Sequence, residues 1–513
     1  MKISFINIRI SSILCLLILY SIITTAQKAP TFITDSLDNY IGKALTTWDI
    51  PGIAVCIVKD EKVIVNKGYG FCELGKNDMV NENTLFMIGS NTKAFTGTAL
   101  AWMAVENKCS LDDKVKKWVP EFSAKDPWVN ENANLTDIVC HRMGTSTFQG
   151  DFTFFDSDLN STQIIEKYGK LTPVNEFRTK WGYCNTGFLL AGRALKPISG
   201  LSWEDFMRTK IFAPLQMKRS LPFISEINDK TNKASAHTLI ENVVKVIPYG
   251  NFDALAPAAS ICSSVEDMSH WLIALLDSGN YQNKNVIPYE AIMKTREPQS
   301  VIGNAYHPFN MSNYSLYGLG WELQDYEGHG LVMHNGGIDG FVTSVTLVPD
   351  ENLGIVVLTN TDQNYLYEAL KWEILDAYLG LPYRNYSKLY SNYFKRRAQR
   401  DNNEINAWRD SAAMNIPAPL PLSEFAGIYE NEVYGAITIK KEAGQLKLSF
   451  EHHKNLSAKL EYIGNNRFLC TYSQPLFGIK VLPFVIEEKK VRSFTLRVAD
   501  FLEYTTYEFL KKK

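Results

Sequence analysis

The chain has 513 residues, of which 45% are hydrophobic and 21% charged, and its formal net charge is -2. Because this length exceeds what one hydrophobic core usually organises, we expect two folded parts, and the composition excludes wholesale disorder. The basic residues are scattered along the chain rather than gathered into a stripe, which excludes a nucleic-acid partner.

The first 26 residues have the pattern of a cleaved signal peptide. Lys2 and Arg9 precede an apolar run over residues 10–23, and the small Ala26 suits cleavage directly after it. The run is shorter than the ~20 residues that span a bilayer. We therefore expect a periplasmic or secreted protein without a stable membrane anchor, while an uncleaved anchor stays open as the alternative.

Residues 27–384 have the pattern of a mixed α/β (α+β) domain. A strand, a polar turn and a second strand between residues 52 and 70 predict an antiparallel hairpin. Residues 92–106 are apolar on nearly every helical face, which predicts a buried helix, and residues 110–300 are mostly helical in pattern. Strand patterns return at residues 319–324, 340–348 and 354–360, before a helical pattern at 365–379. This order predicts an antiparallel sheet built from both ends of the domain, flanked by helices, with a helical subdomain inserted.

The C-terminal region differs in composition. Residues 385–421 are highly charged and then proline-rich, which is typical of a helix leading into a stiff linker. Residues 422–513 contain short alternating strands divided by turns with Gly or Asn, which predicts a small β-barrel or sandwich domain.

The strongest chemical signal is the sequence Ser90-Asn91-Thr92-Lys93, where a strand-like segment runs into the buried helix. Residues three apart share a helix face, so Lys93 can reach the Ser90 hydroxyl. Burial and the positive end of the helix dipole disfavour an ammonium, which suits Lys93 as a base toward a Ser90 nucleophile. Taken alone, such a motif is more often an ordinary helix start with the serine as its cap.

Two further motifs add polar groups. Tyr183 has a phenol that can relay a proton, and Asn185 has an amide that can hold a substrate carbonyl or the lysine. The run His334-Asn335-Gly336-Gly337 precedes a strand; its glycines would let substrate approach, and the amides of Gly337 and Ser90 could form an oxyanion hole. Each motif alone is also compatible with an ordinary turn.

The motifs S-x-x-K, Y-x-N and H-x-G in this order resemble the class C β-lactamase-like serine hydrolases, which also include penicillin-binding proteins, D-aminopeptidases and esterases. The resemblance covers residues 35–380 and includes phrases between the motifs, such as Ile211-Phe212-Ala213-Pro214-Leu215. It implies Ser90 as nucleophile, Lys93 as base, Tyr183 as proton relay and Asn185 as a positioning group. It also implies an antiparallel sheet flanked by helices with an all-helical subdomain. The last 90 or so residues are similar, more weakly, to the lipocalin-like domain of some members.

The sequence departs from the β-lactamase form at His334-Asn335-Gly336, where enzymes that hydrolyse β-lactams usually have Lys-Thr-Gly. This favours an esterase or peptidase acting on a small molecule or peptide. A penicillin-binding protein or β-lactamase is the nearest alternative, and a catalytically silent binding protein is the alternative from another class. The histidines and cysteines form no ligand motif, so neither a metal nor a cofactor is predicted. The sequence leaves a homo-oligomer open.

Overall fold

The computed structural model describes residues 29–512. The predicted signal peptide lies outside this range. Within it, no helix is both long enough and apolar enough to cross a membrane.

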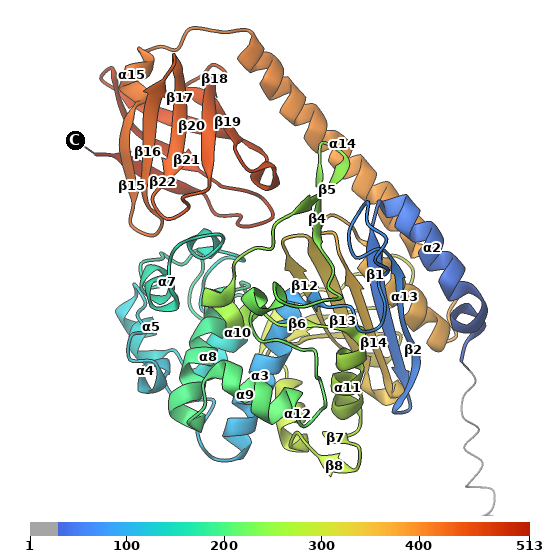
Figure 1. The fold of residues 1–513 in the computed structure, drawn as a ribbon. Coiled ribbons are helices and arrows are strands. Elements are labelled where there is room, and N and C mark those ends of the chain that lie inside the picture. The colour runs from blue at the N-terminus through green and yellow to red at the C-terminus, as the bar shows by residue number, and fades with distance from the viewer. Residues whose placement is uncertain (1–28, 513) are drawn as a thin grey trace, which may run out of the picture.

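An antiparallel sheet of eight strands forms the centre of the first domain (Figure 1). Its strand order is β2-β1-β14-β13-β12-β11-β10-β9. The N-terminal hairpin β1–β2 pairs with β14, so the sheet joins both ends of the domain as predicted. Strands β1 and β14 are buried and apolar because helices cover both faces of the sheet. The strands are β1 (Gly52–Lys59), β2 (Lys62–Gly70), β9 (Ser300–Gly303), β10 (Ser315–Tyr317), β11 (Glu322–Tyr326), β12 (His329–Ile338), β13 (Phe341–Val348) and β14 (Leu353–Thr359).

Side chains alternate between two helical layers, because successive residues of a strand point to opposite faces. The face that includes Ala54 and Val356 packs on the side of α3 (Thr92–Val105) and α11 (Val265–Leu276), and we call it the inner face. The face that includes Ile53 and Val357 packs on α2 (Leu37–Trp48) and α13 (Leu366–Tyr378), and we call it the outer face. The buried helix predicted over residues 92–106 is α3, in which eleven of fourteen residues are buried.

The segment between β2 and β9 is mostly helical, as predicted. An unpredicted hairpin, formed by β4 (Ala236–Ile240) and β5 (Val243–Ile247), projects from it (Figure 1). The remaining α-helices here are α4 (Val115–Trp118), α5 (Pro127–Asn132), α6 (Leu135–Val139), α7 (Ser161–Tyr168), α8 (Asn185–Ser199), α9 (Trp203–Phe206), α10 (Ala256–Ala259) and α12 (Tyr289–Thr295). Short strands are β3 (Phe86–Met87), β6 (Cys262–Ser263), β7 (Asn280–Tyr281) and β8 (Lys284–Asn285).

The single-turn helices also belong mainly to the first domain. They are η1 (Phe32–Ser36), η2 (Gly89–Asn91), η3 (Asp151–Thr153), η4 (Met207–Phe212), η5 (Ile224–Ile227), η6 (Asp253–Leu255) and η7 (Pro349–Glu351), with η8 (Pro475–Phe477) in the C-terminal domain. Two of them, η2 and η3, position functional side chains.

A long helix, α14 (Tyr386–Ala413), leads from the first domain to the second (Figure 1). It occupies most of the segment expected to be a helix and linker. After α15 (Leu422–Phe425), eight antiparallel strands close into a barrel, because β15 pairs with β22 as well as with β16. The C-terminal domain is therefore a barrel and not an open sandwich. Its strands are β15 (Gly427–Asn431), β16 (Gly435–Glu442), β17 (Gln445–Phe450), β18 (Ser457–Tyr462), β19 (Arg467–Tyr472), β20 (Ile479–Glu487), β21 (Lys490–Leu496) and β22 (Tyr507–Lys511).

Candidate active site

Ser90 lies in the turn η2, directly before α3 and beside the inner face of the sheet. Its neighbour Asn91 fixes this turn, because the Asn91 amide donates to the Ile88 carbonyl at 3.1 Å and to Thr343 Oγ1 of β13 at 2.8 Å. The Ser90 side chain remains partly exposed while the residues on either side of it are buried. The turn therefore holds the Ser90 hydroxyl in a fixed position that solvent can reach.

Lys93 lies one helical turn after Ser90 and is completely buried. Its Nζ is 3.0 Å from Ser90 Oγ, 2.6 Å from Asn185 Oδ1 and 2.9 Å from the carbonyl oxygen of Ala258 in α10. Burial lowers the pKa of Lys93 to about 7, although the nearby Asp151 opposes that shift. A substantial fraction of Lys93 is therefore neutral near pH 7.

The three contacts of Lys93 determine what its neutral form can do. A neutral amine has two hydrogens and one lone pair. The Asn185 and Ala258 oxygens can only accept, so they take the two hydrogens, whereas the Ser90 hydroxyl can donate. The lone pair of Lys93 is then left for the Ser90 proton, which is the geometry of a general base next to a nucleophile.

Asn185, the first residue of α8, is held by a second buried group. Its Nδ2 donates to Asp151 Oδ2 at 2.6 Å, which directs its Oδ1 toward Lys93. Asp151 lies in η3, and burial together with the charge of Glu503 raises its pKa well above the usual range. Sequence reasoning found Asn185 but missed Asp151, because no motif links the two positions.

Tyr183 is buried beside this cluster. The Lys93 Nζ lies 4.7 Å from the centroid of the Tyr183 ring. Burial raises the pKa of Tyr183 well above its usual value, and a hydrogen bond with Ser90 opposes that rise. The phenol is therefore protonated at neutral pH and can pass a proton, but it is a poor source of a phenolate base.

His141 orients Tyr183. Its ring lies 4.4 Å from the Tyr183 ring, and its Nδ1 accepts from the Cys184 amide at 3.0 Å. Its carbonyl accepts from the Gly182 amide, so His141 holds the residues on both sides of Tyr183. Burial lowers the pKa of His141 well below its usual value, which keeps the ring neutral.

The glycines of the third motif lie within β12 and not in a turn ahead of a strand. Strand β11 pairs with β12 only as far as Met333, so the next residues have no partner on that side. A Cβ at Gly336 would lie 2.0 Å from the Ile88 carbonyl oxygen, and only glycine lets the strand pack against the Ser90 turn. Gly337 is exposed, and a Cβ on Gly89 would lie only 3.0 Å from its nitrogen. The Gly337 backbone therefore lies next to Ser90, as an oxyanion hole requires.

The other two residues of this motif, His334 and Asn335, were predicted to bind substrate. In the structure, neither side chain lies at the surface beside Ser90. The ring of His334 is only 2% exposed, and its two nitrogens bond to Tyr317 Oη at 3.0 Å and to the Asn335 carbonyl at 2.6 Å. Burial lowers the pKa of His334 to about 3, so the ring is neutral and lies behind the site. Asn335 points to the outer face, where its amide donates to Glu368 of α13. Alternation along the strand places it on the opposite face from Ser90.

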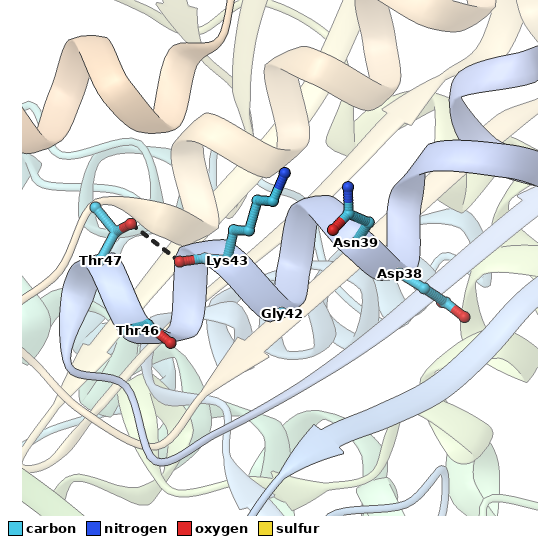
Figure 2. A pocket seen from close by; sticks show the side chains of 6 residues that line it. All are labelled: Asp38, Asn39, Gly42, Lys43, Thr46 and Thr47. Atoms are coloured by element: carbon cyan, nitrogen blue, oxygen red, sulfur yellow. Dashed lines mark hydrogen bonds between the residues drawn. The ribbon is translucent and has the colours of Figure 1, made fainter.

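A polar hollow on the outer surface is separate from this cluster. Figure 2 shows that all of its lining residues belong to α2, where the Thr47 hydroxyl donates to the Lys43 carbonyl at 2.9 Å. Helix α2 covers the outer face, whereas Ser90 lies beside the inner one. The hollow therefore plays no part in the candidate active site. Among residues 29–512, no group of three or more side chains could hold a metal ion.

Comparisons with known proteins agree with this geometry. The family model described as Beta-lactamase matches residues 37–379, and a domain of unknown function, DUF3471, matches residues 411–510. An unguisins hydrolase of Aspergillus campestris is 27% identical over 78% of this chain and 76% of its own length. Protein flp of Staphylococcus aureus is 29% identical over 66% of each chain.

Solved structures share the fold. The octameric penicillin-binding protein homologue from Pyrococcus abyssi superposes with a TM-score of 0.57 at 21% identity, covering 93% of this chain and all of that one. A crystal structure of SurE superposes with a TM-score of 0.55 at 16% identity, covering 94% of this chain and 99% of that one. The family model spans most of the chain and includes every residue of the cluster around Lys93. The chain therefore belongs to the beta-lactamase family of serine hydrolases.

Proposed function

We propose that this protein hydrolyses peptide, amide or ester bonds through an acyl-enzyme on Ser90. The observation that carries the proposal is the environment of Lys93, a fully buried amine that contacts the Ser90 hydroxyl and otherwise only carbonyl oxygens. A catalytically silent binding protein would have no need for a buried amine with a pKa near 7 beside a partly exposed serine.

The chemistry follows from these contacts. Lys93 takes the Ser90 proton as Oγ attacks the substrate carbonyl, and the amides of Ser90 and Gly337 stabilise the oxyanion. When the tetrahedral intermediate collapses, the proton passes from Lys93 through the Tyr183 hydroxyl to the leaving group. Water then attacks the acyl-enzyme and passes a proton through Tyr183 to Lys93, and Lys93 protonates Ser90 Oγ as the ester bond breaks and the acid leaves.

The neutral His334 argues against substrates that must be held by a carboxylate. Lysine-bearing relatives have a cation at this strand position that can hold a substrate carboxylate, but the buried His334 ring is neutral here. We therefore propose an esterase or peptidase in preference to a β-lactamase or a D-alanine carboxypeptidase. The name of the unguisins hydrolase is consistent with hydrolysis and does not decide between these substrates.

Parallel labelling tests the acyl-enzyme. The protein is treated with a fluorophosphonate probe and with a penicillin probe, and the adducts are mapped by mass spectrometry. We expect the fluorophosphonate on Ser90 and loss of both labelling and ester turnover in Ser90→Ala. An adduct on another serine, or undiminished turnover in the variant, would contradict the assignment.

We further propose that the N-terminal segment directs export to the periplasm or medium. Its basic start, short apolar run and small residues before Gln27 support this. N-terminal sequencing of the mature protein from its native host should begin at Gln27, and a mature chain that retains Met1 or the apolar run would contradict the proposal.

A further inference from the structure

The barrel contacts the first domain at η3, the turn that carries Asp151. Figure 1 shows the barrel lying over the end of the helical subdomain that contains α7. Its His453 ring stacks on Phe152 at a centroid distance of 3.8 Å and an interplanar angle of 8°, and the His453 Nε2 donates to the Phe152 carbonyl at 2.8 Å. Beside them, Lys454 forms an ion pair with Asp158 at 2.7 Å. The barrel is therefore fixed to the segment that also lines the active site.

Glu503, an acidic residue of the barrel, is buried in this contact. Glu503 is only 1% exposed, and its Oε1 accepts from the Gly150 amide at 2.9 Å. Its other oxygen accepts from the hydroxyl of Tyr434, which also belongs to the barrel. A buried carboxyl group that receives a backbone N–H from another domain fixes that backbone position, because leaving it unpaired would be costly.

The residue that Glu503 holds is the last one before Asp151. Gly150 has a φ of +91°, and a Cβ there would lie 2.8 Å from Leu171 Cδ1, so this backbone geometry depends on glycine. From Asp151 the contacts continue through the Asn185 amide to Lys93, at 2.6 Å for each step. An unbroken series of buried polar contacts thus joins the barrel to the amine beside Ser90.

We propose that Glu503 of the barrel is a positioning residue of the active site, which orients Lys93 by fixing Gly150 and Asp151. This inference rests on the proposed role of Lys93 as the base. The barrel is then part of the catalytic unit, although it contributes no group that touches substrate through this route. Misplacement of a base by a fraction of an ångström is enough to slow proton transfer.

Glu503 can also act on the base through charge when it is ionised. The titratable groups that face it are Asp151 from the first domain and Tyr434 and Tyr507 from the barrel. The charge of Glu503 raises the pKa of Asp151, and a neutral Asp151 does less to stabilise the ammonium of Lys93. Burial raises the pKa of Glu503 itself to about 7, so this charge is largely absent over the acidic limb, and the hydrogen bond from Gly150 is the contact on which the inference rests.

The test compares Glu503→Ala with Glu503→Gln in the full-length protein, using a p-nitrophenyl ester. Alanine removes the acceptor for Gly150, so kcat should fall about tenfold with KM within about twofold. Glutamine keeps an acceptor oxygen, so kcat should stay within about threefold. The matched control is Glu508→Ala, which removes a barrel carboxylate that bonds Ser493 and should change neither quantity.

Hydrogen exchange gives a readout independent of turnover. Glu503→Ala should speed exchange in residues 148–155 and also in residues 181–187, which include Asn185. The inference is overturned if kcat and exchange at 181–187 both match the wild type, or if only exchange at 148–155 changes. If the alanine variant does not fold, Glu503→Asp, whose carboxyl group is one methylene farther from Gly150, replaces it, and unchanged kcat and exchange at 181–187 in that variant overturn the inference. If wild-type turnover survives Ser90→Ala, the proposed function fails and exchange at 181–187 alone decides the inference.

Discussion

Lys93 and Lys371 are both almost fully buried on opposite sides of the central sheet, and they are held differently. Lys93, by the inner face, contacts carbonyl oxygens and the Ser90 hydroxyl, with an amide between it and the nearest carboxyl group. Lys371, on the outer face, is 1% exposed and forms an ion pair with Glu368 at 2.6 Å. A direct carboxylate partner favours the ammonium, whereas neutral acceptors do not offset the cost of burial. The first arrangement suits a base and the second a structural ion pair.

The largest expected effect comes from replacing each of the two lysines with methionine in turn. Lys93→Met should lower kcat about 10²- to 10⁴-fold with the fold retained, because a general base is lost. Lys371→Met should keep activity within about threefold but lower the free energy of unfolding by about 1.5–3 kcal/mol, because the partly buried Glu368 loses its ion partner and keeps only the Asn335 amide. Ester turnover and urea denaturation measure the two effects. Equal loss of activity in both variants would contradict the division of roles.

A second and smaller expected effect follows from the neutral His334, and it is measured by comparing two substrates of the wild-type protein. A hydrogen bond to a charged partner contributes about 1.5–3 kcal/mol, so its absence should cost roughly ten- to a hundred-fold for substrates held by a carboxylate. We therefore expect kcat/KM for a chromogenic penicillin to be lower by that factor than for a p-nitrophenyl ester. Equal efficiency on both would favour the β-lactamase alternative.

The smallest expected effect distinguishes the hydrogen-bonding role of the Asp151 side chain from the role of its charge. Burial raises the pKa of Asp151 well above its usual value, which favours the neutral form of the carboxyl group that receives the Asn185 amide. Asp151→Asn keeps an acceptor oxygen and should change kcat at pH 7 by less than about threefold. Asp151→Ala removes it and should lower kcat about tenfold. Ester kinetics with both variants measure this, and a large loss in Asp151→Asn would mean that the charge is required.

The sequence was sufficient where function or fold depends on residues close together in the chain. The hairpin β1–β2, helix α3 and the Ser90–Lys93 pair all follow from local periodicity or spacing. The barrel also followed from short alternating strands, although similarity to lipocalins stays a prediction.

Contacts between distant segments could not be predicted in this way. The Ala258 carbonyl that binds Lys93 has no side-chain signature, and Asp151 and Glu503 meet only because two domains dock. The face of the sheet to which the Asn335 side chain points could be predicted only if its motif was known to lie within a strand. In a strand, a shift of one residue moves a side chain to the opposite face. The sequence therefore predicted the groups next to Ser90, including Asn185, but not the distant groups that complete their contacts.

The most direct test of the central claim is the pH dependence of Ser90 phosphonylation by a fluorophosphonate, measured between pH 5 and 9 by mass spectrometry. If Lys93 is the base and its pKa is about 7, the rate should rise roughly tenfold per pH unit at low pH and level off above pH 7. The acidic limb reflects protonation of Lys93 and should be missing from the residual rate of Lys93→Met. A rate that is independent of pH, or one that still rises steeply above pH 8.5, would contradict the account.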